Sequence, residues 1–230
     1  EETGEGARAV AADPRYLELR PDWAFALHNL PGAPLGAVVL RDGTFNCASR
    51  GLVVHLEGAT SHAAHPEHGR SPAPAMCALV GELARLHLDG SLVDDGLVLS
   101  TVVHARLGEV AFGTSPGAAV VMATLRAERD DSMERLASLA STRAELIARE
   151  HGLGCRIEWR DVFVASVNDP GAADRVRSAA RACGVRVVER ERPFRWSEDF
   201  GALGATARSA MFGLGAGEDH AQLHADDYDF

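Results

Sequence analysis

The sequence predicts an α/β protein in which one α/β layer is interrupted by an inserted domain and then resumes. Three observations support this prediction. The chain has 230 residues, of which 46% are hydrophobic and 24% charged, enough to bury a core. Segments with the apolar spacing of helices alternate with short β-rich runs. From residue 50 to residue 166 the order of these segments is β-α-β-β-α-β, which is the split βαβ unit of ferredoxin-like domains.

Residues 1–49 are expected to form the first segment of the interrupted domain. The pattern predicts a helix over residues 6–19, with a break at Asp13-Pro14, where proline follows a capping side chain. A buried strand over residues 23–27 should end at His28. The proline and glycine residues that follow indicate a loop.

Residues 50–166 are expected to form the inserted domain. Ser71 with Pro72 is typical of a helix start, and apolar residues then recur every three or four positions. Asp131 and Glu134 resemble a capping box that opens a second helix, which should end near Gly152. The expected strands of this domain cover residues 52–57, 97–106, 118–126 and 155–164.

Residues 167–230 are expected to complete the interrupted domain. The glycine-rich segment from Gly213 to Gly217 is interpreted as a loop, and its spacing does not fit a dinucleotide-binding fingerprint. Nucleotide binding is therefore rejected. Helices are expected over residues 172–183 and 196–203, and strands over residues 185–188 and 209–214.

Composition excludes several classes of protein. The formal net charge is −10, so the chain has no basic footprint for nucleic acid or an anionic membrane. Its longest apolar runs, such as residues 117–125, are shorter than the ~20 residues that cross a bilayer. The four cysteines are scattered, which favours reduced thiols and a cytoplasmic location.

Glu1, Glu2 and His28 are the first candidates for chemistry. Adjacent carboxylates repel each other, which suits a base beside a metal ligand, although the pair read alone is more typical of a solvated terminus. His28 is expected at a strand end, where α/β folds place ligands, and its alternative role is a hydrogen-bonded core histidine.

His62, Arg126 and Glu198 are further candidates. His62 begins a series of three histidines at intervals of three. The series is a weak candidate for a zinc site, because Pro66 would interrupt a helix that aligned the three side chains. The segment is either a polar loop or the source of a hydrogen bond to an oxyanion. Arg126 is either an anchor for a carboxylate or an ordinary surface arginine. Glu198 belongs to the run Glu198-Asp199-Phe200, which is expected on a short helix and has no role assigned.

The order of the motifs is more specific than any one of them. The motifs are Glu1-Glu2, His28-Asn-Leu-Pro-Gly, Gly58-x-x-Ser-His62-Ala-Ala-x-Pro, Trp196-Ser-Glu-Asp-Phe and Gly213-x-Gly-x-Gly followed by Gln222-Leu-His224. Taken together they resemble the metal-dependent amidohydrolases that include aminoacylases, hippurate hydrolases, indoleacetyl-amino-acid hydrolases and zinc carboxypeptidases. The branch that hydrolyses N-acyl amino acids is the most similar.

The resemblance implies a three-layer catalytic domain with two divalent ions, interrupted by a βαββαβ dimerisation domain. Zinc is the expected metal, with manganese, cobalt or nickel as alternatives. The substrate would be an N-acyl amino acid or a small peptide-like amide, and the enzyme a homodimer through the inserted domain. In this resemblance Glu1 matches the general base, and the metal ligands are matched by Glu2, His28 and His224. His62 matches the oxyanion donor that usually reaches across the dimer. Arg126 matches the anchor for the substrate carboxylate.

Two departures from the family pattern affect these expectations. Gly113 stands where the family usually has asparagine, which leaves the substrate open. The family also takes two ligands from a His-x-Cys-Gly-His-Asp segment upstream of Glu1, and it has a helix beyond the position of Phe230. The chain is therefore interpreted as a fragment that lacks the N-terminal part and the last helix, and that holds little or no metal by itself.

Two other functions remain open. One is a non-catalytic dimerisation or binding module in which the metal site is never completed. The other is a mononuclear hydrolase that uses Glu2, His28 and His224 alone, since three protein ligands and a water make a catalytic zinc site.

Overall fold

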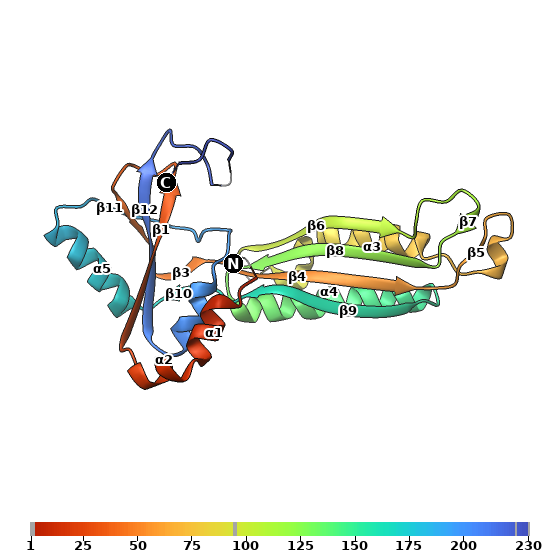
Figure 1. Cartoon of the computed structure of the whole chain (residues 1–230), viewed down its shortest axis with the longest axis horizontal. Helices are drawn as coiled ribbons and strands as arrows, with labels where there is room; N and C mark the ends of the chain where they lie inside the picture. The colour runs from red at the N-terminus through yellow and green to blue at the C-terminus, as the bar shows by residue number, and fades with distance from the viewer. Residues whose placement is uncertain (1–2, 94–95, 224, 230) are drawn as a thin grey trace. The chain divides into compact units, whose positions relative to one another are not determined.

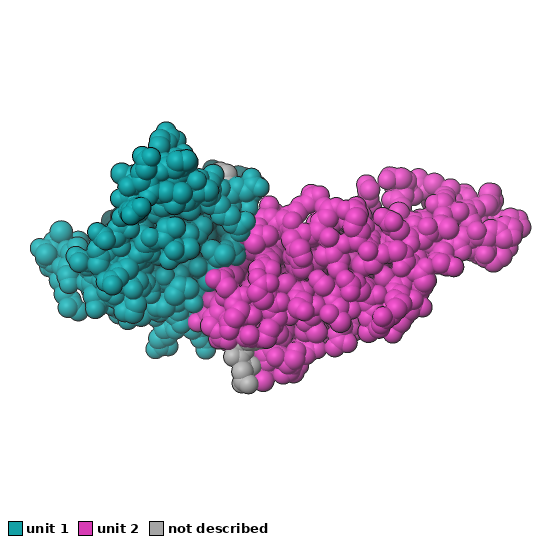
Figure 2. Space-filling model, turned by 90° about the horizontal axis from the view of Figure 1, so that it is seen from below, with its two compact units in different colours: residues 1–47, 163–230 teal, residues 48–162 magenta. Residues whose placement is uncertain are grey.

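The chain folds into two compact units in the computed structural model. The structure describes residues 3–93, 96–223 and 225–229. Unit 1 comprises residues 1–47 and 163–230, and unit 2 comprises residues 48–162 (Figure 2). Each unit contains both helices and sheets, which confirms the α/β class (Figure 1).

Unit 1 is built on a mixed four-stranded sheet in the order β1-β12-β2-β11. Strand β1 runs parallel to β12, β12 runs antiparallel to β2, and β2 runs parallel to β11. A second, two-stranded sheet pairs β3 with β10. The bounds are β1 Trp23–Pro31, β2 Val38–Leu40, β3 Gly43–Asn46, β10 Ser166–Asn168, β11 Val187–Glu189 and β12 Arg208–Gly217.

Helix α5, Pro170–Ala182, packs against the larger sheet and forms the core of unit 1. Its first turn is capped by Asp169, whose carboxylate accepts a hydrogen bond from the Ala172 N–H at 2.9 Å. Val176 and the small alanines on its inner face contact Leu40 of β2 and Ala210 of β12. The short side chains let the helix approach the strands closely.

The predicted break at Asp13-Pro14 is confirmed, because α1 spans Gly6–Ala12 and α2 spans Pro14–Leu19. Asp13 accepts a hydrogen bond from the Arg15 N–H at 2.8 Å, which starts the second helix. The short helix expected over residues 196–203 is instead a 3₁₀ helix, η4, over Asp199–Ala205.

Two expectations about unit 1 were wrong. Strand β1 continues to Pro31, so His28 lies within the strand and not at its end. The segment from Gly213 to Gly217 is the last part of β12 and not a loop. The reason is close packing: a Cβ on Gly213 would lie 1.9 Å from Leu30 Cδ1, and one on Gly215 would lie 1.9 Å from the Pro34 carbonyl oxygen. Glycine lets β12 pass close to β1 and to the loop that follows β1.

Unit 2 confirms the predicted β-α-β-β-α-β order. Its four-stranded sheet has the order β6-β8-β4-β9, and helices α3 and α4 cover one face (Figure 1). Strands β4 and β6 both run antiparallel to β8. The bounds are β4 Ala48–Glu57, α3 Ala73–Arg85, β6 Val98–Leu107, β8 Ala118–Ala127, α4 Asp130–Glu150 and β9 Gly154–Phe163.

Buried and more exposed side chains alternate along much of β4 and β8, and the buried ones lie on the face that the helices cover. Leu52 and Val54 pair across the sheet with Ala123 and Val121, and all four are buried. Facing them, the helices contribute buried apolar side chains at the predicted spacing: Leu79 and Leu83 from α3, and Met133, Leu136 and Ile147 from α4.

The helix starts in unit 2 differ from the predictions. The proposed capping box is absent, because α4 begins at Asp130 and the Glu134 carboxylate accepts two hydrogen bonds from the Arg50 guanidinium of β4. Helix α3 begins at Ala73, although the Ser71 hydroxyl still accepts a hydrogen bond from the Ala73 N–H at 3.3 Å. The predicted end of α4 is confirmed, since Gly152 follows it with φ +65°.

Short elements complete unit 2. Strand β5, Ser61–His62, pairs with β7, Thr114–Ser115, in a separate two-stranded sheet (Figure 1). Three 3₁₀ helices are described here: η1 Pro66–His68, η2 Leu86–Leu88 and η3 Gly90–Leu92. Among the described residues of the whole chain, no helix combines the length and the apolar character needed to cross a membrane.

Candidate functional site

His28 lies in β1 opposite Gly213 of β12. Its Nδ1–H donates a hydrogen bond to the Asn29 carbonyl oxygen at 2.7 Å, and its ring packs against Trp196 with 4.8 Å between centroids. A carbonyl oxygen can only accept, so the Nδ1 atom carries the proton. The Nε2 atom of His28 is therefore the one that faces a partner.

That partner is Glu198, whose carboxylate Oε1 lies 3.4 Å from His28 Nε2. The hydrogen bond that the Glu198 carboxylate accepts raises the pKa of His28, partial burial opposes the rise, and the Asn29 carbonyl adds to it. The two side chains are partly exposed, at 21% for His28 and 37% for Glu198, so solvent reaches the pair.

Glu198 is the functional candidate to which the sequence assigned no role. The only signal was its place in the Trp196-Ser-Glu-Asp-Phe motif, because its distance from His28 along the chain hides the contact. The neighbouring Asp199 has a different function: its carboxylate accepts a hydrogen bond from the Ala7 N–H of α1 at 2.7 Å. The motif thus supplies one carboxylate to His28 and another to a helix start.

Three predicted site residues, Glu1, Glu2 and His224, lie outside the described residues. Their roles stay predictions. Near His224 in sequence, the Gln222 side chain lies beside Gly32, which has φ +81° and follows β1 directly. The described geometry therefore unites His28 with Glu198 and Trp196 and leaves the other expected ligands untested.

His62 ends β5 and its side chain is exposed. Its Nδ1 accepts a hydrogen bond from the Ala64 N–H at 3.1 Å. The neutral ring must then carry its proton on Nε2, which makes Nε2 a potential donor. This tautomer is the one that an oxyanion donor requires.

Arg126 lies near the end of β8, on the sheet face opposite the helices, and is partly buried. It pairs in register with Ser49, the second residue of unit 2, and with Leu99 of β6. Its place in the sheet fixes its backbone firmly, as an anchor for a carboxylate would need.

His62 lies near the start of β8, in the small β5-β7 sheet, whereas Arg126 lies near the end of β8. The Cβ position of Gly117, which precedes β8, lies against Thr60, two residues before His62. From Ala118 to Arg126 the strand rises about 3.4 Å per residue, or roughly 27 Å in all. One small substrate cannot contact both side chains of a single chain.

The His28 geometry fits a divalent metal. Metal-bound histidines commonly donate the second ring N–H to a carbonyl or carboxylate, which fixes the tautomer, and His28 makes this bond to Asn29. Its Nε2 is then directed toward a carboxylate, a ligand type that zinc, manganese and cobalt all accept. Within the described residues, the site offers one imidazole and one carboxylate at this point.

Comparison with known proteins identifies the family. The sequence profile of the peptidase family M20/M25/M40 matches residues 1–230. The chain belongs to this family. The more specific assignment to the branch that hydrolyses N-acyl amino acids is a matter for proposal.

Relatives of this M20 chain agree with its fold. An uncharacterized hydrolase of Staphylococcus haemolyticus is 25% identical over 218 residues, which cover 92% of this chain and 55% of the relative. A dinuclear metal-binding peptidase of the M20 family from Bacillus subtilis has a TM-score of 0.74 at 17% identity, covering 96% of this chain and 57% of that one. An aminobenzoyl-glutamate utilization protein from Klebsiella pneumoniae has a TM-score of 0.71 at 21% identity, and the match covers 84% of this chain and 50% of that one. The chain thus spans about half the length of the relatives it matches.

Proposed function

We propose that this chain is part of a metal-dependent hydrolase that cleaves the amide bond of N-acyl amino acids or small peptide-like substrates. The observation that carries the proposal is the geometry of His28, whose Nδ1–H is held by Asn29 while its Nε2 is directed toward Glu198. Membership of a peptidase family supports amide hydrolysis. The dinuclear peptidase from Bacillus subtilis supports two divalent ions.

The proposed metal ligands within this chain are Glu2, His28 and His224. When bound, two divalent ions lower the pKa of water and polarise the amide carbonyl. Glu1 is the proposed general base, which takes a proton from the attacking water and passes it to the leaving amine. Zinc is the first metal to test, followed by manganese, cobalt and nickel.

His62 and Arg126 are the proposed substrate-binding side chains. The Nε2–H of His62 would donate a hydrogen bond to the oxyanion of the tetrahedral intermediate. Arg126 would hold the substrate carboxylate through two parallel hydrogen bonds. Because His62 lies next to the start of β8 and Arg126 lies near the other end of that strand, we propose that the His62 serving one active site comes from a second copy of the chain.

The proposed assembly is a homodimer through the inserted domain, residues 50–166, while residues 1–49 and 167–230 belong to the catalytic domain. Strand β6 lies at an edge of the unit 2 sheet, and its Val103 side chain is 59% exposed. An edge strand of this kind can pair across a two-fold axis. A cytoplasmic location is proposed from the cysteine pattern alone.

The decisive experiment is an assay of the complete enzyme against N-acetyl and N-benzoyl amino acids. We expect hydrolysis that a chelator abolishes and that zinc, manganese or cobalt restores, and His28→Ala should prevent the restoration. Metal analysis separates one bound ion from two, and thus a mononuclear from a dinuclear enzyme. Absence of hydrolysis with every metal and substrate would overturn the proposal in favour of a non-catalytic binding module.

A further inference from the structure

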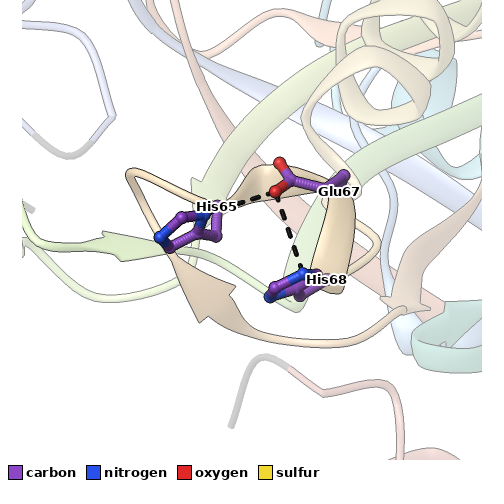
Figure 3. Close-up of side chains that lie close together, drawn as sticks. All are labelled: His65, Glu67 and His68. Atoms are coloured by element: carbon purple, nitrogen blue, oxygen red, sulfur yellow. Dashed lines mark hydrogen bonds and ion pairs between the residues drawn. The ribbon is translucent and has the colours of Figure 1, made fainter.

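His65, Glu67 and His68 gather at one point on the loop that follows β5 (Figure 3). The His65 Nδ1 lies 3.3 Å from Glu67 Oε1, and the His68 Nε2 lies 3.8 Å from the same oxygen. The two imidazole rings stack at 5.4 Å between centroids with 15° between planes. One potential ligand atom from each residue lies within 4.8 Å of the other two. This is the one such group of three found among the described residues.

We propose that these three side chains form a binding site for a single divalent transition-metal ion, separate from the catalytic metals. Two imidazoles and one carboxylate are a ligand set that zinc uses in proteins, with water at the fourth position. Imidazole nitrogen also favours zinc, copper and nickel over magnesium and calcium, which prefer oxygen.

The distances support a tetrahedral ion. Ligands at about 2.0–2.1 Å from zinc stand roughly 3.4 Å apart in a tetrahedron. The separations of 3.3 Å and 3.8 Å around Glu67 Oε1 approach this value, and all three ligand atoms lie within 4.8 Å of one another, so side-chain rotations that shorten the longer separations complete the geometry. All three side chains are more than 60% exposed, which leaves them room for such rotations.

The backbone of the loop holds the three residues together. The His65 N–H donates to the His62 carbonyl at 2.9 Å, and the His68 N–H donates to the His65 carbonyl at 3.2 Å. Pro66 begins the 3₁₀ turn η1, and its ring fixes φ. Pro66, which made the spacing unfavourable for a helical zinc site, therefore places His65 and His68 side by side in a 3₁₀ turn.

Stability of the loop does not account for the cluster. Ion pairs between exposed side chains contribute little to stability, and Glu67 alone serves both histidines. A divalent ion at the centre would instead bind all three groups at once. The three side chains are therefore better explained as ligands of a cation than as a source of stability for the fold.

The test is zinc titration of the full 230-residue chain by calorimetry, in a His28→Ala background that removes a proposed catalytic ligand. We expect one zinc ion to bind, and His65→Ala or His68→Ala to weaken its affinity by at least the roughly 10–100-fold that loss of an outer-shell partner costs. Glu67→Gln should weaken it too, and magnesium should not compete. Zinc should also raise the melting temperature, and less so in the variants.

His104→Ala is the matched control, because His104 is another exposed histidine of unit 2 on strand β6. It should leave zinc affinity unchanged. The proposal is overturned if no zinc binds, if His65→Ala/His68→Ala binds zinc as the parent chain does, or if His104→Ala has an equal effect. The background variant separates this result from the fate of the proposed hydrolase, since the readout is binding to unit 2 and requires no catalysis.

Discussion

The imidazole Nε2 of His28 and the carboxylate Oε1 of Glu198 lie 3.4 Å apart, although the two residues come from the two separate stretches of chain that form unit 1. The contact joins a strand residue to the segment just before η4, and Trp196 packs on the same ring. His28 is thereby held on both sides, by the Asn29 carbonyl at Nδ1 and by Glu198 at Nε2.

Replacing Glu198 by Gln should weaken divalent-metal binding at His28, because a negative charge beside the ligand atom is lost. We expect a decrease in affinity of about 10–100-fold in the complete enzyme, as for other groups that orient metal ligands. Competition with a chromophoric chelator measures it. Glu191→Gln, an exposed residue of the same unit, is the control, and equal affinities for both variants would refute the role of Glu198.

His62→Ala should lower kcat of the complete enzyme by the ~10²–10³ that loss of an oxyanion donor costs. If His62 acts across a dimer, mixing His28→Ala subunits with His62→Ala subunits should restore activity. Statistical exchange would complete about a quarter of the active sites of a symmetric dimer. A mixture no more active than its two components would show that His62 does not act in trans.

Arg126→Ala should raise KM selectively for substrates that carry a free carboxylate, since a bidentate hydrogen bond to that group is removed. The matched substrates are an N-acyl amino acid and its carboxamide, assayed with both proteins. We expect the variant to lose most of the preference for the acid. An equal loss on both substrates would mean that Arg126 is structural.

Gly215→Ala should destabilise unit 1, because its Cβ would lie 1.9 Å from the backbone oxygen of Pro34 and the strand would have to move. Overpacking of this kind costs about 1–3 kcal/mol in the free energy of unfolding. Gly81→Ala is the matched control: it lies within α3, where the nearest atom is Arg85 Nη2 at 4.0 Å, and it should stabilise by about 0.5–1 kcal/mol. Urea unfolding measures both, and equal effects would contradict the packing argument.

The Arg50–Glu134 pair should make the stability of unit 2 depend on pH in acid. Hydrogen bonds from Arg50 hold the pKa of Glu134 below its ordinary value. A carboxyl whose pKa is lowered by folding contributes stability above its unfolded pKa, and this contribution is lost as the pH falls through the folded pKa. Because Glu134 is 67% exposed, the contribution is at most about 1 kcal/mol.

Glu134→Gln should therefore reduce the loss of stability between neutral and acid pH, and urea unfolding at a series of pH values measures the difference. Glu150→Gln, an exposed residue at the end of the same helix, provides the comparison. A pH profile unchanged by Glu134→Gln would show that the ion pair contributes nothing measurable.

The sequence predicted the elements that depend on local patterns. The apolar spacing of α3 and α4, the break at Asp13-Pro14 and the end of α4 before Gly152 all follow from preferences of neighbouring residues. The order of strands and helices in unit 2 followed as well, because each element of a βαββαβ unit carries its own periodicity.

Elements that depend on distant partners were mispredicted. Gly213 and Gly215 indicate a loop by composition, yet parallel pairing with β1 makes them strand residues. Glu134 has the spacing of a capping residue, but Arg50 of β4 binds its carboxylate instead. In both cases a tertiary contact outweighs a local preference.

The sequence by itself determined the α/β class, the βαββαβ unit and the series of motifs that places the chain in the M20 family. Only the tertiary structure decided that Glu198 faces His28, that His62 and Arg126 lie at opposite ends of the path of β8, and that Pro66 brings two histidines together around Glu67. The physical reason is that side-chain chemistry is local to a residue. Which side chains come into contact depends on strand register and on the turns of the chain, and no single residue specifies these.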